Sequence, residues 1–223
     1  MKAYYAARAK EYDKIYLKSE RQTDLRLLEQ WLPPKFAQAD VLEVAAGTGY
    51  WTQFLAPVAR SLVALDASAE TFDVARSRLA GLDAASASAP GLKQVQWLIG
   101  DAYAIPQPAV LYDAAFAGFW FSHVPLARQR EFLLGLTRVL KPGAKVVLLD
   151  NLYVPGSSTP ISERDAYGNS FQTRLLADGS EHRLLKNFPT ESQLIDCVKG
   201  LGTEPVLTTW QYFWAFEFTV VKS

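Results

Sequence analysis

The chain has 223 residues, of which 49% are hydrophobic, and its 23 lysine and arginine residues are balanced by 23 aspartate and glutamate residues. This composition excludes a disordered chain and allows one domain with a sizeable core, while the zero net charge argues against a protein that grips nucleic acid non-specifically. One cysteine and two histidines exclude an internal disulfide, and with so few soft ligands we expect no metal site.

The N-terminal stretch MKAYYAARAKEYD lacks the continuous apolar core of a signal peptide. No apolar run approaches the roughly 20 residues needed to span a bilayer. We therefore expect a cytoplasmic protein with no membrane partner. Two helices are predicted before the first strand, over residues 1–10 and 23–31, and Pro33 and Pro34 stop the second.

Strands and helices then alternate along the chain. Short apolar runs predict the strands, and apolar residues at helical spacing predict the helices. The predicted strands cover 41–45, 61–65, 95–99, 112–117 and 145–149, and the predicted helices cover 50–58, 69–79 and 127–140. The Ala/Ser-rich stretch DAASASAPG is predicted as a loop. This alternation predicts a parallel sheet with helices on both faces.

The pattern changes after Asp150. Residues 151–188 are polar, and QTRLLADGSEHRLL within them predicts a hairpin, followed by a helix over 191–198. The chain ends in WQYFWAFEFTVV, where bulky aromatic residues occupy every second position, as in a strand. No linker divides the chain, so we expect a single domain.

The stretch VLEVAAGTGYWT, residues 41–52, joins a predicted strand to a predicted helix through Gly47 and Gly49. Glycines let a ligand come close to the backbone, and parallel sheets bind ligands beyond the carboxyl ends of their strands. A dinucleotide site would have a third glycine where Thr52 stands. The loop is therefore weak evidence for a pyrophosphate ligand.

Carboxylates surround this loop and narrow the choice of ligand. Asp66 ends the second strand, where an acidic group can accept both hydroxyl hydrogens of a ribose. Asp101 follows the third strand and can accept from an exocyclic amino group, and Glu43 in the first strand can face a cationic ligand. These carboxylates disfavour a pyrophosphate. They suit S-adenosylmethionine, which has a sulfonium, an α-amino group, a ribose and an adenine but no phosphate.

Several motifs in order resemble those of the class I S-adenosylmethionine-dependent methyltransferases that act on small molecules. They are EVAAGTG, Asp66, GDA at 100–102, DAAFAGFWFSHV at 113–124 and LKPGAKVVLLD. The resemblance implies a Rossmann-like α/β fold with a seven-stranded, mostly parallel sheet whose last strand is reversed. It also implies N-terminal lid helices within residues 1–35 and a substrate-covering insertion at 151–190. Ala45 replaces the first glycine of the family's loop, and we expect it to tighten the loop.

The resemblance also implies which residues surround the cofactor, S-adenosylmethionine. The side chains and backbone expected to bind it belong to Tyr12, Glu43, Ala45, Gly47, Gly49, Trp51, Asp66, Ala67, Ser68, Asp101, Ala102, Ala117, Gly118 and Phe119. Ser68 is also expected to cap the helix that follows it.

His123 and the insertion are the candidates for chemistry on the acceptor. A neutral imidazole just after the fourth strand can take a proton from a substrate hydroxyl or amine, but Ser122, His123 and Pro125 are also typical of a helix start. A cation of the insertion can bind a substrate carboxylate, or can simply lie on a solvated hairpin face. The residues expected near the substrate are Tyr5, Trp120, Arg164, Asn169, Gln172, Arg174 and Lys186.

The function expected from these observations is methyl transfer from S-adenosylmethionine to an oxygen or nitrogen nucleophile of a small molecule. Two alternatives stay open: an NAD(P)-dependent oxidoreductase, and a catalytically silent cofactor-binding protein of the same fold. The first would need the missing third glycine, and a Tyr-x-x-x-Lys pair is not apparent after the fourth strand. The sequence specifies neither the acceptor nor the oligomeric state.

Overall fold

The computed structural model describes residues 13, 16–85, 95–175 and 179–221. The helix predicted over residues 1–10 and the two lid candidates, Tyr5 and Tyr12, lie outside these residues. Within the described part of the chain, no helix is both long and apolar enough to cross a membrane.

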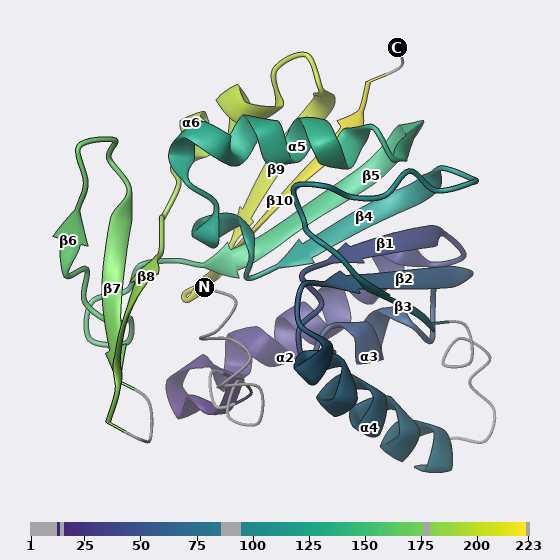
Figure 1. The fold of residues 1–223 in the computed structure, drawn as a ribbon, viewed down its shortest axis with the longest axis horizontal. Helices are drawn as coiled ribbons and strands as arrows, with labels where there is room; N and C mark the ends of the chain where they lie inside the picture. Colours follow the sequence, from purple (N-terminus) through teal and green to yellow (C-terminus); the bar gives the residue numbers. More distant parts are fainter. Residues whose placement is uncertain (1–12, 14–15, 86–94, 176–178, 222–223) are drawn as a thin grey trace.

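Seven strands form one sheet in the order β3-β2-β1-β4-β5-β10-β9 (Figure 1). Neighbouring strands run parallel, except that β10 is antiparallel to both β5 and β9. The predicted seven-stranded sheet with a reversed last strand is therefore confirmed. The strands are β1 (Asp40–Val44), β2 (Ser61–Asp66), β3 (Val95–Ile99), β4 (Tyr112–Gly118), β5 (Leu140–Asn151), β9 (Gly202–Thr209) and β10 (Phe213–Val220).

Helices cover both faces of the sheet, as predicted (Figure 1). One face carries α2 (Gln22–Trp31), α3 (Thr52–Leu55) and α4 (Ala69–Ala85), and the other carries α5 (Gln129–Thr137) and α6 (Glu191–Val198). Short 3-10 turns connect these elements: η2 (Ser19–Arg21), η3 (Pro33–Phe36), η5 (Phe121–His123) and η6 (Leu126–Arg128).

The core is divided by the sheet into two apolar layers. In β10, Trp214 and Phe216 pack in the layer under α5 and α6, whereas Phe213 and Ala215 pack in the layer that contains the buried leucines of α2. Successive side chains of a strand point to opposite faces. Because both faces are covered, the strands read as continuous apolar runs in the sequence.

Helix boundaries differ from the predictions in three places. The helix predicted over 50–58 is only the four-residue α3, because the loop that precedes it occupies the chain as far as Trp51. The helix predicted over 69–79 continues as α4 to Ala85, into the stretch predicted as a loop. The helix predicted over 127–140 ends at Thr137, because Leu140 already pairs with β4 as the first residue of β5.

The sequence did not predict β9. This edge strand follows α6 and pairs only with β10 among the described strands, and most of its side chains are exposed. An edge strand of this kind carries little apolar signal. The C-terminal aromatic alternation also begins later than predicted, because Trp210 precedes β10 and packs edge-on against Trp31, with ring centroids 5.2 Å apart.

The insertion forms a second, antiparallel sheet, which includes the predicted hairpin. Its strands are β6 (Glu163–Arg164), β7 (Ser170–Leu175) and β8 (Glu181–Leu185). Figure 1 shows that this sheet stands beyond the carboxyl end of β5, at the edge of the main sheet where ligands of parallel sheets bind.

Candidate active site

The loop after β1 bends through residues with left-handed backbone. Ala45, Gly47 and Gly49 have φ of 56°, 54° and 71°. This conformation costs an L-residue roughly 1–2 kcal/mol, so Ala45 keeps the shape of the family's first glycine at some strain. A Cβ on Gly49 would lie 2.8 Å from the Cβ of Ala75. Gly49 is therefore required for close packing of the loop on α4.

Asp66, the last residue of β2, holds the loop in place from the neighbouring strand. Its carboxylate accepts the backbone N–H of Gly47 at 2.8 Å and that of Ser68 at 2.9 Å. Burial raises the pKa of Asp66, and these N–H groups oppose the rise. Ser68 itself donates its hydroxyl to Glu70 at 2.5 Å, so the expected helix cap is instead a contact between two side chains.

A cavity of about 580 Å³ opens at the carboxyl ends of β1, β2, β3 and β4. Small-molecule sites commonly enclose roughly 300–1,000 Å³. The cavity is lined by Ala45, Gly47, Leu65, Asp66, Ala67, Ser68, Thr71, Ile99, Gly100, Asp101, Ala102, Tyr103, Gly118, Phe119, Trp120, His123 and Arg128. The structure thus brings together most of the residues predicted around the cofactor.

The far end of the cavity combines an apolar wall with a carboxylate. Asp101 is exposed and accepts the backbone N–H of Tyr103 at 2.9 Å, so it stabilises its own turn while lining the cavity. Ile99, the last residue of β3, is 58% exposed and forms part of the wall. An apolar residue at the carboxyl end of a strand is the sequence signal that could have identified Ile99 as a lining residue.

Other lining residues were also missed by the sequence analysis. The Arg128 guanidinium stacks 3.6 Å from the ring centroid of Tyr103 and pairs with Glu131 at 2.8 Å. Leu65, Thr71 and Gly100 complete this group. None of these residue types marks a ligand site by itself, so only their place around the cavity in the folded chain identifies them.

Four residues predicted to contact the cofactor do not line the cavity: Glu43, Gly49, Trp51 and Ala117. Glu43 is 1% exposed and accepts the hydroxyl of Thr52 at 2.7 Å. Its burial raises its pKa to about 8. Trp51 lies directly behind Gly118, where a Cβ would come within 2.9 Å of its ring. These residues support the cavity wall from behind.

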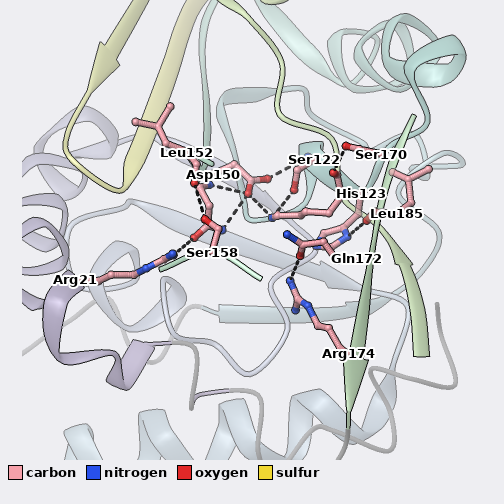
Figure 2. Close-up of polar contacts among 12 residues, drawn as sticks. Arg21, Ser122, His123, Asp150, Leu152, Ser158, Ser170, Gln172, Arg174 and Leu185 are labelled. Atoms are coloured by element: carbon pink, nitrogen blue, oxygen red, sulfur yellow. Dashed lines mark hydrogen bonds and ion pairs between the residues drawn. The ribbon is translucent and has the colours of Figure 1, made fainter. Parts of the chain in front are cut away.

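His123 lines the cavity and is held from behind by the insertion (Figure 2). Its Nδ1 lies 2.6 Å from the carbonyl oxygen of Leu185. Burial and the charge of Lys186 lower its pKa to about 3, although Asp150 opposes both. The imidazole is therefore neutral, with its proton on Nδ1 and its basic lone pair on Nε2.

A buried ion pair fixes the turn that carries His123. Lys186 Nζ donates to Asp150 Oδ1 at 2.7 Å and to the hydroxyl of Ser122 at 2.6 Å. Asp150 Oδ2 accepts the backbone N–H of Ser122 at 3.0 Å. Asn187 adds a bond to the carbonyl of Val124. Lys186, predicted near the substrate, is thus bonded inside the fold.

The other predicted substrate residues have different surroundings. Asn169 accepts the backbone N–H of Leu126 at 2.8 Å and so joins the insertion to η6. Gln172 donates to the carbonyl of Thr159 at 2.6 Å and so holds the insertion together. Arg164 is exposed on β6. Arg174 bonds Gln172. Trp120 lines the cavity, and its buried indole Nε1 has no hydrogen-bond partner among the described residues.

Comparisons with known proteins agree on the kind of fold that carries this site. A family model described as a methyltransferase domain matches residues 41–143. The structure of DhpI in complex with SAH has a TM-score of 0.77 and 26% sequence identity, over 99% of this chain and 95% of that chain. By this match and by its fold, the chain resembles the class I S-adenosylmethionine-dependent methyltransferases.

Curated methyltransferases match this chain over only part of their own length. A demethylmenaquinone methyltransferase of Clavibacter sepedonicus is 27% identical over 170 residues, 76% of this chain and 62% of the relative. One of Bacillus cereus (strain B4264) is 32% identical over 115 residues, 50% of this chain and 44% of the relative. The chain therefore spans less than two thirds of the curated relatives it matches.

Proposed function

We propose that this chain transfers a methyl group from S-adenosylmethionine to an oxygen or nitrogen nucleophile of a small molecule. The observation that carries this proposal is the pair of carboxylates in one cavity. Asp66 at the end of β2 and Asp101 after β3 lie on its wall, beside the glycine loop that follows β1, and neither forms an ion pair with a described residue. Such a wall suits hydroxyl and amino donors better than a pyrophosphate.

The residues of the cavity fit the parts of this cofactor. Asp66 would accept the ribose hydroxyls, and Asp101 would accept the adenine amino group, with Ile99 and Ala102 against the ring. The loop from Ala45 to Gly47 would face the methionine part, together with Gly118 and Phe119. The Nε1 of Trp120, which has no hydrogen-bond partner among the described residues, supplies a donor on the same wall.

When bound, the sulfonium supplies an electrophilic methyl carbon, which a nucleophile attacks as the carbon–sulfur bond breaks and its electron pair returns to sulfur. The protein's task is then to align the acceptor and exclude water, and such positioning can supply about 7–11 kcal/mol. Phe119 and Trp120, which line the cavity near its strand-β4 end, are placed to exclude water. We propose that residues 151–190 cover the acceptor from the opposite side.

His123 is the proposed proton acceptor, through Nε2. The carbonyl oxygen of Leu185 fixes the tautomer by accepting a hydrogen bond from Nδ1–H. A base works best when its pKa lies near the working pH, and burial and Lys186 hold the pKa of His123 at about 3. We therefore expect His123 to contribute modestly until a bound acceptor changes the local charge.

The names of the similar proteins refer to small molecules. They include demethylmenaquinone methyltransferases and a DhpI–SAM–HEP complex, which is 27% identical with a TM-score of 0.74 over 96% of this chain. These names support a small acceptor for this chain. They do not identify one acceptor, because this chain spans less than two thirds of the length of the curated relatives.

The test is methyl transfer with radiolabelled S-adenosylmethionine and a panel of small hydroxy, amino and carboxylic acids and quinols. We expect label in an acceptor, and S-adenosylhomocysteine, the demethylated product, as a tight ligand. Binding of the product without label in any acceptor would favour the catalytically silent alternative. Binding of NADH in place of the product would favour the oxidoreductase.

A further inference from the structure

Two arginines near the cavity, one buried and one half-buried, have no carboxylate partner among the described residues. Arg21, at the end of η2, is 7% exposed; its Nε donates to the hydroxyl of Ser157 at 2.9 Å and its Nη1 to the side chain of Asn151 at 2.8 Å. Arg174, on β7, is half-buried and donates only to Gln172, at 3.1 Å. All these partners are neutral, and neither guanidinium forms an ion pair with a carboxylate of the described residues.

This arrangement differs from that of three more exposed arginines in the described residues. Arg60, Arg128 and Arg183 are each bonded to a carboxylate although their side chains are about half exposed. Burying a guanidinium costs free energy unless an anion compensates it. In addition, the buried Nε of Arg174 has no hydrogen-bond partner among the described residues. Arg174 therefore keeps an unused donor and no carboxylate partner among the described residues, and Arg21 has only the nearby charge of Glu20 to offset its own.

The two guanidinium groups influence one another and the residues around them. Burial lowers the pKa of Arg21, and repulsion from Arg174 lowers it further, although Glu20 opposes both. Burial likewise lowers the pKa of Lys186, and repulsion from Arg174 and Arg21 adds to this. Asp150, which acts on Lys186, is already bonded to it, and Glu20, which acts on Arg21, is bonded to Ser157. Figure 2 shows Arg21 and Arg174 reaching toward the middle of the view from opposite sides.

The arginines adjoin the side of the cavity where the acceptor would lie. The guanidinium of Arg21 is 5.9 Å from the ring centroid of Phe213, which is 5.8 Å from that of Phe119 on the cavity wall. The charge of Arg174 contributes to lowering the pKa of His123, on the same wall. A ligand held by these arginines would therefore lie beside Phe213, on the side of the cavity that Phe119 and His123 line.

We propose that Arg21 and Arg174 together bind an oxyanion of the methyl acceptor, so that the substrate is a small molecule bearing a carboxylate or a phosphate-type group. This inference rests on the proposed methyltransferase function. A guanidinium presents planar, paired N–H donors that match such oxyanions, and it stays charged when buried. Arg21 comes from the N-terminal part of the chain and Arg174 from the insertion, so the acceptor would join these two segments.

An oxyanion at this place would also act on His123. The charged groups that influence His123 are Lys186 at the end of β8, Asp150 on β5 and Arg174 on β7. A bound anion would offset the repulsion from Arg174 and Lys186, which now disfavours the imidazolium. The acceptor would thereby bring the base toward its working range.

The test uses the full chain saturated with S-adenosylhomocysteine and two probes, acetate and inorganic phosphate, titrated at constant ionic strength against chloride. The chain has only two histidines, His123 and His182, so their ring signals in NMR spectra are readily separated. We expect saturable binding of at least one probe and a rise in the apparent pKa of His123 when it binds. The preferred probe identifies the kind of oxyanion. Absence of saturable binding for both probes would overturn the proposal.

Variants of Arg174 separate this inference from the cofactor site. Arg174→Met should lower the affinity for the probe by about tenfold or more and abolish the effect of the probe on the pKa of His123. Arg174→Lys should have an intermediate effect, because it keeps the charge but loses the paired N–H donors of the guanidinium. The control, Arg183→Met, removes an equal charge from the neighbouring strand and should leave probe binding unchanged. Equal weakening in both Met variants, or none in Arg174→Met, would contradict the proposal.

The affinity for S-adenosylhomocysteine distinguishes the two proposals. We expect it to be unchanged in Arg174→Met, which also shows that this variant is folded. If the parent protein binds the product but neither probe, the oxyanion inference alone fails. If the parent does not bind the product, the proposed function fails first.

Discussion

Asp66 combines two tasks in one carboxylate, because it fixes the loop through Gly47 and lines the cavity at the end of β2. Asp66→Ala removes a charged acceptor that we assign to the ribose. Hydrogen bonds to charged groups contribute about 1.5–3 kcal/mol, so we expect the affinity for S-adenosylhomocysteine to fall by roughly 10- to 100-fold. Isothermal titration calorimetry measures this directly.

Two further variants show whether the loss belongs to ligand binding. Asp66→Asn keeps an oxygen for the N–H of Gly47 and should lose less affinity than Asp66→Ala. Asp73→Ala removes an exposed carboxylate of α4 that pairs with Arg76 and should have no effect. Unchanged affinity in Asp66→Ala would remove the ribose assignment.

Glu43 shows how a motif carboxylate can be structural. Its pKa is raised to about 8, mainly by burial, from an ordinary value of 4.5. Between these pH values the native state holds a proton that the unfolded state has released, so the free energy of unfolding decreases as the pH rises through this window. Glu43→Gln does not titrate and can still bond Thr52, so its stability should depend less on pH.

Urea unfolding of the parent and Glu43→Gln near pH 5 and pH 8 tests this expectation. The variant should gain stability relative to the parent at the higher pH. Glu181→Gln, at the exposed start of β8, is the control and should follow the parent. Parallel pH profiles for the parent and Glu43→Gln would show that Glu43 is ionised in the native protein.

At the scale of elements, the ion pair of Lys186 and Asp150 joins the insertion to the main sheet. Both side chains are almost fully buried, at 4% and 0% exposure. Removing one partner leaves an uncompensated buried charge, which costs about 3–5 kcal/mol. Lys186→Met should therefore lower the free energy of unfolding by about this amount, as measured in urea.

The double variant Lys186→Met/Asp150→Asn tests whether charge is the cause. It removes the isolated carboxylate and should recover a substantial part of the stability. Lys199→Met, which removes an exposed lysine paired with Asp196, should cost at most about 1 kcal/mol. A single variant as stable as this control would show that the pair does not hold the insertion.

The elements that the sequence predicted best are those with a local physical cause. The helix over 191–198 is confirmed at both ends, because Thr190 and Gln193 form a reciprocal capping box. The strands β1, β2 and β4 were predicted because residues on both of their faces are buried, and β3 was predicted from its apolar run although it is a partly exposed edge strand. β9 was missed for the opposite reason, since its outward side chains are polar and Pro205 interrupts the pattern.

The site was predictable where the family's motifs mark strand ends, and not elsewhere. Asp66, Asp101 and Gly118 follow directly from such motifs. Arg21 could not be found this way, because its environment comes from Asn151, Ser157 and Phe213, far along the chain. Glu43 has the expected motif position, but only the packing under the loop shows that it does not reach the cavity.

At the scale of the whole molecule, the cavity is built from loops that follow four different strands, so a ligand there stabilises the native state as a unit. A ligand at 100 times its dissociation constant adds about 2.7 kcal/mol to the free energy of unfolding. For a chain of this size each kcal/mol raises the melting temperature by about 2–4 °C. S-adenosylhomocysteine should therefore raise it by roughly 5–10 °C.

Thermal unfolding with NADH provides the matched comparison, because both ligands contain adenosine but only NADH carries a pyrophosphate. The carboxylates on the cavity wall should disfavour that pyrophosphate, so NADH at the same concentration should leave the melting temperature unchanged. Asp66→Ala should lose most of the shift caused by S-adenosylhomocysteine. A larger shift with NADH than with S-adenosylhomocysteine would contradict the assignment of this cavity.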